Sequence, residues 1–174
     1  MDDHEREVRR LRLAARSQQL EVESAEAELA MAQTSLTERL CEWAALGRRV
    51  RVDAVDRRRY GRLVHVGESV VTLSAEAGLR ELIVLAHVEG VVIDEDPDVV
   101  GERIDWSNGH PRTLVAHLRS LVDAAGPVTI DRRSSDPITG SVIGVAPTHV
   151  SLRVGSGREA LIPHDAVVSV TSSF

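Results

Sequence analysis

Residues 61–91 read GRLVHVGESVVTLSAEAGLRELIVLAHVEGV, and residues 140–170 read GSVIGVAPTHVSLRVGSGREALIPHDAVVSV. The two stretches align without a gap, with glycines and aliphatic residues at matching positions, such as Gly61 with Gly140. Upstream, VRVD (50–53) matches VTID (128–131) once one residue is inserted in the loop. Because identities and order agree over the whole unit, the sequence predicts an internal repeat.

Each copy of the repeat is predicted to hold a short helix followed by about five strands. The helices are LTERLCEWAALG (36–47) and LVAHLRSLVDAAG (114–126), and the later segments alternate or run apolar over strand lengths. Aromatic residues make up only 2% of the chain, so a core must be built from aliphatic side chains, which suit pleated sheets. Gly61 and Gly140 fall early in the second strand, where a tightly bent barrel favours glycine. The pattern predicts two small, helix-capped, five-stranded barrels in tandem.

The first 46 residues show a different pattern. No Pro or Gly occurs from Glu5 to about Leu46, and Gly47 follows as the expected helix end. Apolar or small residues, with Gln18 completing the series, recur every three or four positions, which is typical of a coiled-coil seam. We therefore expect a long helix that forms a homo-oligomer, with a single solvated helix as the alternative. The seam consists of Leu11, Ala15, Val22, Ala25, Leu29, Ala32 and Leu36.

These patterns divide the chain into four parts and predict an α+β fold class. The parts are the helix (1–46), the first barrel (47–93), an acidic linker (94–112) and a helix with the second barrel (113–174). The linker DEDPDVVGERIDWSNGHPR holds Pro and Asn-Gly turn signals, so the domain boundary is placed there.

GRRVRVDAVDRRRYGRLVHVGESVVTLSAEAGLRELIVLAHVEGV (47–91) resembles the Sm-like or SH3-like small β-barrel superfamily, in particular the C-terminal barrel of the bacterial ribosome maturation factor RimP. The full layout is similar to small actinobacterial tandem-barrel proteins of uncharacterised function, some of them labelled Fis-like regulators. RNA-binding Sm proteins carry Asp and Asn in the loop between strands two and three, where this chain has Gly67 and Val71. The resemblance therefore implies the fold but not the uridine pocket.

The densest charge feature is RRVRVDAVDRRRYGR (48–62), with seven arginines and two aspartates. We expect Arg57, Arg58 and Arg59 at the tip of a hairpin between the first two strands. Such a cluster is suited to a phosphate backbone or an acidic protein surface, and it could also dock on the acidic linker of the same chain or remain a solvated turn. The candidate nucleic-acid or acidic-partner residues are Arg48, Arg49, Arg57, Arg58, Arg59 and Arg62.

Other site chemistry is not indicated, so we expect no catalytic residues, no metal and no cofactor. The seven histidines are scattered, and Cys41 is expected to be a buried small hydrophobe. No phosphate-binding loop of the GxxxxGK type occurs, because the chain has no lysine. No apolar run is long enough to span a bilayer, and we expect a cytoplasmic protein without membrane contact. The sequence favours a non-enzymatic, oligomeric binding or scaffold module that engages a protein partner. The alternative is a nucleic-acid- or ribosome-associated factor that uses the arginine-rich hairpin.

Overall fold

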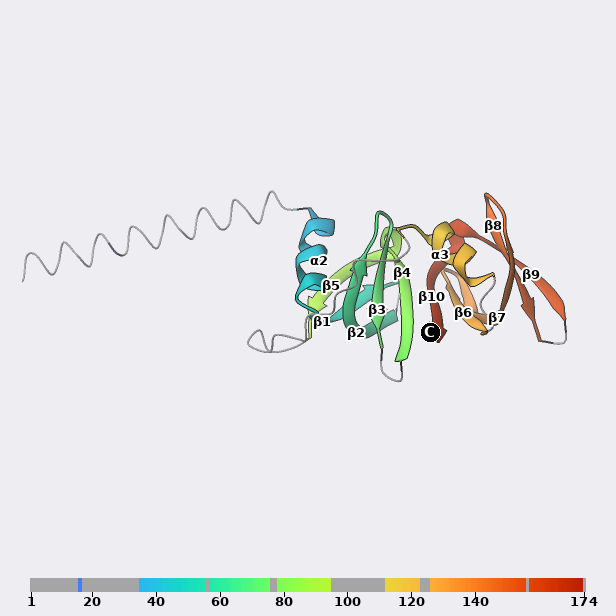
Figure 1. Ribbon diagram of the computed structural model, residues 1–174, viewed down its shortest axis with the longest axis horizontal. Helices are drawn as coiled ribbons and strands as arrows, with labels where there is room; N and C mark the ends of the chain where they lie inside the picture. Colours follow the sequence, from blue (N-terminus) through green and yellow to red (C-terminus); the bar gives the residue numbers. More distant parts are fainter. Residues whose placement is uncertain are drawn as a thin grey trace, which may run out of the picture. The chain divides into compact units, whose positions relative to one another are not determined.

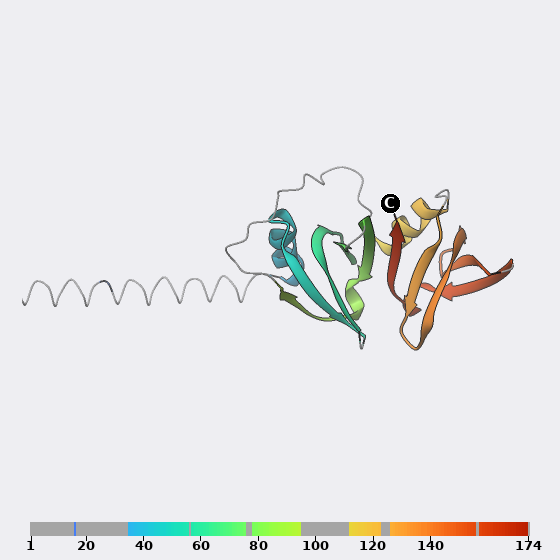
Figure 2. The same ribbon diagram turned by 90° about the horizontal axis from the view of Figure 1, so that it is seen from below.

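The computed structural model describes residues 35–55, 57–75, 78–94, 112–122, 126–155 and 157–173, together with Arg16. The chain divides into two compact units, Met1–Arg39 and Leu40–Phe174. The second unit holds ten strands, which form one antiparallel sheet in the order β5-β1-β2-β3-β4-β10-β6-β7-β8-β9 (Figures 1 and 2). The sheet has two halves with the same strand order. The first half is β5-β1-β2-β3-β4, and the second half is β10-β6-β7-β8-β9, in which the last strand of the chain segment likewise precedes the other four.

The strand bounds follow the alternating apolar segments of the sequence. In the first half they are β1 (Arg49–Ala54), β2 (Arg57–Val66), β3 (Val70–Ser74), β4 (Leu79–Val84) and β5 (Val88–Ile93). In the second half they are β6 (Val128–Arg132), β7 (Ser135–Val145), β8 (His149–Val154), β9 (Arg158–Pro163) and β10 (Val167–Ser173). Short 3-10 helices, η2 (Leu85–His87) and η3 (His164–Ala166), precede β5 and β10.

The predicted pair of separate five-stranded barrels is wrong. Strands β4 and β10 pair antiparallel from Ser169 opposite Ile83 to Ser173 opposite Leu79, and this pairing joins both halves into one continuous sheet. The physical reason is that a five-stranded half leaves hydrogen-bonding groups unpaired at its outer strand. In the ten-stranded sheet, the backbone groups on this edge of β4 pair with those of β10.

The predicted long coiled-coil helix is also corrected, because no helix within the described ranges exceeds the ten residues of α2 (Leu36–Ala45). The amide of Ser35 donates to Glu38 Oε2 at 2.7 Å, and the amide of Glu38 donates to Ser35 Oγ at 3.2 Å. This reciprocal pair is a capping box, which begins a helix at Leu36 inside the predicted continuous one. The hydrogen bond from the Ser35 amide, together with the Ser35 side chain, lowers the pKa of the Glu38 carboxyl. Leu36 is 55% exposed, and the other six seam residues lie outside the described residues.

The end of α2 agrees with the sequence. Gly47 has a φ of 61°, its amide donates to the Ala44 carbonyl, and the amide of Arg48 donates to the Trp43 carbonyl, each at 3.0 Å. These bonds make a Schellman motif, which glycine favours. Cys41 in this helix is exposed, so its expected burial is wrong.

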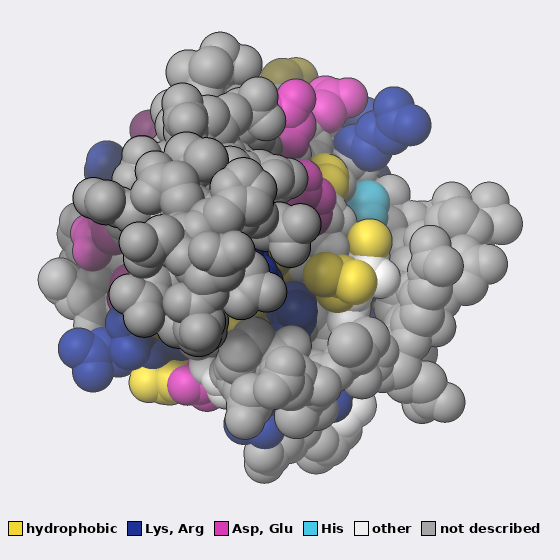
Figure 3. All heavy atoms as spheres, turned by 90° about the vertical axis from the view of Figure 1, so that its left-hand side faces the viewer, with side chains coloured by type: hydrophobic (Ala, Val, Ile, Leu, Met, Phe, Trp, Pro, Cys, Tyr) yellow, Lys and Arg dark blue, Asp and Glu magenta, His cyan; other side chains and the backbone are white. Residues whose placement is uncertain are grey.

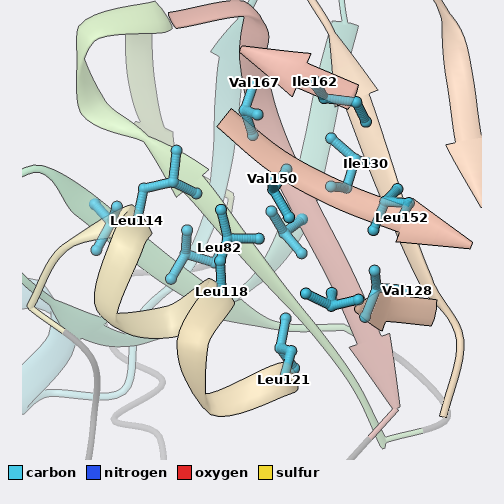
Figure 4. Close-up of a cluster of buried hydrophobic side chains, with 13 residues drawn as sticks. Leu82, Leu114, Leu118, Leu121, Val128, Ile130, Val150, Leu152, Ile162 and Val167 are labelled. Atoms are coloured by element: carbon cyan, nitrogen blue, oxygen red, sulfur yellow. The ribbon is translucent and has the colours of Figure 1, made fainter. Parts of the chain in front are cut away.

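Two clusters of buried aliphatic side chains form the core, and each one takes residues from both halves. The first cluster contains Leu82 of β4 together with the leucines of α3 (Leu114–Leu121) and inward residues of β6 to β10 (Figure 4). The second cluster contains residues of the first half together with Val168 of β10. The joint between β4 and β10 is therefore packed as well as hydrogen-bonded.

The second strand of each half passes close to its neighbour. A Cβ atom on Gly61 would lie 2.8 Å from the Ser74 carbonyl oxygen, and one on Gly140 would lie 2.5 Å from the Arg153 carbonyl oxygen. Only glycine fits such an approach without a shift of the backbone.

Candidate functional site

Strands β1 and β2 form the hairpin that carries the arginine-rich segment. Ala54 pairs with Arg57 and Asp53 with Arg58, so the two-residue connection lies at positions 55 and 56. Successive side chains of a strand point to opposite faces. Arg57 and Arg59 therefore share one face of β2, and Arg58 lies on the other. The β1–β2 hairpin therefore places the arginines of the predicted cluster on two opposite faces of the sheet.

Arg59 lies inside the protein, with only 6% of its surface exposed. Its Nε atom lies 2.6 Å from Glu81 Oε1, and its Nη2 atom lies 2.8 Å from Asp131 Oδ2. Nη1 donates to the Ala54 carbonyl oxygen at 2.9 Å. The hydroxyl of Ser169 donates to Glu81 Oε1 at 2.8 Å. Arg59 thus connects β2, β4 and β6, and Ser169 adds β10, so this residue stabilises the joint between the halves.

The neighbouring arginines are also opposed by carboxylates. Arg57 Nη1 lies 2.9 Å from Asp131 Oδ1, although half of the Arg57 side chain is exposed. Asp53 lies 3.2 Å from Arg51 and 3.8 Å from Arg58, whose side chain is 70% exposed. The positive charge of the hairpin is therefore largely compensated within the fold. On the face drawn in Figure 3, arginine side chains likewise lie beside acidic ones.

A surface hollow of about 560 Å³ brings together four of the six predicted arginines. Within it, Arg49 lies 4.0 Å from Asp94, and Arg62 Nη1 donates to the Gly47 carbonyl oxygen at 3.0 Å. Neither Arg57 nor the half-buried Arg48 lines this hollow. Its described lining consists of Arg49, Arg58, Arg59, Tyr60, Gly61, Arg62, Ser74, Ala75 and Glu81.

The chemistry of this hollow is that of anion recognition. No histidine or cysteine is among its described lining residues, and its carboxylate, Glu81, is held by Arg59 and Ser169. Across the described ranges, no three His, Cys, Asp or Glu residues come together in a way that could hold a metal ion. The lining offers guanidinium groups and one half-exposed aromatic ring, Tyr60, rather than a nucleophile with a base.

The two ends of the sheet form the other candidate surface. Strands β5 and β9 are its outermost strands, so among the described strands each has a neighbour on one side only. Leu161 of β9 is 60% exposed and Val92 of β5 is 44% exposed. Unpaired backbone groups beside exposed aliphatic side chains are features that a further strand can cover. The strand pattern of the sequence does not show that β5 and β9 are the outermost strands, because the order of strands in the sheet depends on tertiary pairing.

Sequence reasoning also missed the carboxylates around Arg59. Asp131 is the last residue of VTID, the segment that matches VRVD, so the alignment singled it out as a repeated strand residue. Glu81 and Ser169 carry no signal in the sequence. Glu81 contacts Arg59 across β2 and β4 of one half, and Ser169 reaches Glu81 because β10 pairs with β4. Carboxylate partners from strands so distant along the chain are not readable from spacing.

Comparison with known proteins adds no assignment, because no protein-family model matches the chain and no curated protein matches it in sequence. Among the described residues, no helix is both long and apolar enough to cross a membrane.

Proposed function

We propose that this protein is a non-enzymatic binding or scaffold module that engages a protein partner by accepting a strand at an open edge of its sheet. The observation that carries this proposal is the exposure of Leu161 on the outermost strand β9. An edge strand offers a row of backbone donors and acceptors, which give affinity to an added strand, while exposed side chains beside it give specificity.

The state of the arginines supports a protein partner over nucleic acid. Arg59 is buried between two carboxylates, Arg57 contacts Asp131, and Arg58 faces Asp53. A phosphate backbone would have to compete with these carboxylates, and phosphate binding rests on the release of counterions by uncompensated cations. The sheet edge carries no such internal competitor in the described part of the chain.

The test compares two exposed aliphatic residues on different strands. Leu161→Lys places a charge at the open edge, and Ile143→Lys places the same charge on β7, which has strand neighbours on both sides. Proteins captured from the native host by the wild-type chain are identified and purified, and their binding to each variant is measured by calorimetry. We expect Leu161→Lys to weaken binding at least about tenfold and Ile143→Lys to leave it unchanged. Equal binding by both variants would contradict the edge as the binding surface.

The arginine hollow favours a second candidate function, which is nucleic-acid binding. Three of its arginines reach the surface: Arg58 is 70% exposed, Arg49 is 49% exposed, and Arg62 is exposed and donates to a backbone carbonyl. Tyr60 beside them is 46% exposed and offers a surface for one base to stack on.

The second candidate is tested by titrating labelled single-stranded RNA and duplex DNA at several salt concentrations. Three phosphate contacts predict a slope of log K against log salt of about −2 for a single strand. The triple change of Arg49, Arg58 and Arg62 to Ala should abolish that slope. The matched control changes Arg119, Arg133 and Arg153, which are also exposed, to Ala. Absence of binding at low salt would remove this candidate. Arg59 is kept in both variants because it is part of the core.

A further inference from the structure

The joint between β4 and β10 is an internal example of how the two free edges could pair. The alignment that places Gly61 on Gly140 also places the first residue of β4 on the first residue of β9, and the first residue of β5 on that of β10. In the sheet, β4 lies between β3 and β10, whereas β8 is the one described strand that pairs with β9. The free side of β9 therefore corresponds to the side of β4 that β10 covers. By the same comparison, the free side of β5 corresponds to the side of β10 that β4 covers.

Burial at equivalent positions shows what the open edges lack. Leu82 of β4 is 1% exposed and lies among the α3 leucines (Figure 4), whereas its equivalent in β9, Leu161, is 60% exposed. Val170 of β10 is fully buried, whereas its equivalent in β5, Val91, is half-buried. Strands β9 and β5 thus carry the same kind of aliphatic residue as β4 and β10. In the middle of the sheet these residues are covered because β4 and β10 pair with each other.

We propose that the partner at the open edge is a second copy of this chain, whose β5 pairs antiparallel with β9. This inference rests on the proposed function and names the partner of that edge. The register follows when each residue of the β4·β10 ladder is replaced by the residue aligned with it in the other half. It places Gly90 opposite Ile162, Val91 opposite Leu161, Val92 opposite Ala160, Ile93 opposite Glu159, and Asp94 opposite Arg158.

Charge supports this register at the end of the ladder. Asp94 and Arg158 are both exposed and carry opposite charges, and opposed charges stabilise a cross-strand pair. Pro163, which lacks an amide hydrogen, lies one residue beyond the five proposed pairs, so the ladder does not require its missing donor. Glu89 also lies just outside the ladder and is exposed.

The copy-to-copy joint differs from the internal joint in its polar groups. The positions equivalent to Arg59, Glu81 and Ser169 are Ile138, Ala160 and Gly90, so the buried ion pairs have no counterpart. The ion pairs therefore distinguish the two kinds of β-pairing. A copy cannot exchange its internal β4·β10 pairing for an external one without separating Arg59 from Asp131 and Glu81 from Ser169. We expect the external joint to be weaker and reversible.

The symmetry of this pairing is heterologous, because β9 and β5 are different surfaces. Every added copy leaves one β5 and one β9 free, so the contact builds a closed ring or an open chain according to its rotation. Chain growth with concentration is the expected behaviour in solution.

The first experiment measures the mass of the 174-residue chain by sedimentation over a wide range of concentration. We expect the mass to rise with concentration, Leu161→Lys to weaken association about ten- to a hundredfold, and Ile143→Lys to have no effect. Circular dichroism and thermal unfolding of each variant check that the fold is kept.

A charge exchange tests the register without changing an apolar residue. Arg158→Glu and Asp94→Arg should each weaken self-association, since each places like charges opposite one another. An equimolar mixture of these two variants should associate like the wild type, because every contact between unlike copies again pairs opposite charges. In copies that also carry Cys41→Ser, Val92→Cys mixed with Ala160→Cys should form a disulfide, whereas Val92→Cys mixed with Arg158→Cys should not.

The outcomes separate this inference from the proposed function. A wild-type chain that stays monomeric at every concentration overturns the inference, and so does association that Leu161→Lys leaves unchanged or a mixture that fails to recover. If the chain is monomeric but a purified protein still binds it and is lost with Leu161→Lys, the proposed function stands and only the identity of the partner is wrong. If neither self-association nor partner binding responds to Leu161→Lys, both are overturned.

Discussion

Replacement of Arg59 by methionine tests the role of the buried ion pairs in joining the two halves of the sheet. Methionine keeps a similar length and apolar stem but removes the contacts to Glu81 at 2.6 Å and Asp131 at 2.8 Å, and the hydrogen bond to the Ala54 carbonyl. Two carboxylates would then lie at the joint without their central cation. Glu81 keeps its bond from Ser169.

The magnitude follows from the burial of the partners. Removal of one member of a buried ion pair costs about 3–5 kcal/mol, because the remaining charge is left uncompensated. The Glu81 and Asp131 side chains are 16% and 17% exposed, and Asp131 keeps Arg57 at 2.9 Å. Residual solvation and this second cation favour the lower end, so we expect the free energy of unfolding to fall by about 3 kcal/mol.

Urea unfolding of the full chain, followed by circular dichroism and analysed by linear extrapolation, measures this change. The control is Arg58→Met, which removes an arginine that is 70% exposed and should change the free energy by less than about 0.5 kcal/mol. Glu81→Gln in the Arg59→Met background should restore part of the loss, because it removes one uncompensated charge. A loss below about 1 kcal/mol for Arg59→Met, or simple additivity with Glu81→Gln, would refute the reasoning.

Three further predictions concern single residues of the second half of the sheet and its helix. Burial lowers the pKa of His117 from 6.5 to about 4, so the folded protein keeps its full free energy of unfolding above pH 6.5 and loses part of it as the pH falls toward 4. Urea unfolding at pH 6.5 and pH 4 should show the wild type losing about 3 kcal/mol relative to His117→Leu. The same pH dependence in both proteins would contradict this. Gly140→Ala should destabilise by about 1–3 kcal/mol because its Cβ would lie 2.5 Å from a backbone carbonyl, whereas Gly144→Ala on the same strand, which meets nothing within 4 Å, should not show that loss in thermal unfolding. Thr113→Ala removes the side-chain acceptor that caps α3 at 3.2 Å and should cost about 1 kcal/mol in the same assay, with Thr113→Ser close to wild type.

The strands were predictable because their signals are local. Alternation of apolar residues marks strands such as β1 and β8, and a buried pattern follows the same period in both. Gly47 ends α2 with hydrogen bonds that span three and five positions, whereas Gly140 is required by the neighbouring strand of the same hairpin. The start of α2 was missed although its signal, Ser35 followed by Glu38, is in the sequence, because the continuous seam pattern outweighed it.

The candidate site was only partly predictable. The arginine cluster is visible in the sequence, and its position on the β1–β2 hairpin follows from the strand pattern. Whether each arginine is available depends on carboxylates from distant strands, and the burial of Arg59 at 6% is decided by Glu81 and Asp131. Spacing along the chain carries no information about such partners.

The strands follow from local signals in the sequence, because the alternation of apolar residues acts within a few positions. The pairing of β4 with β10, which makes one ten-stranded sheet instead of two barrels, depends on contacts between distant parts of the chain. The physical reason is that each half of the sheet leaves an unpaired edge, and the choice between closing on itself and joining its neighbour depends on packing of Leu82 and Val168 across the joint. The same joint buries Arg59 and leaves β5 and β9 as the open edges.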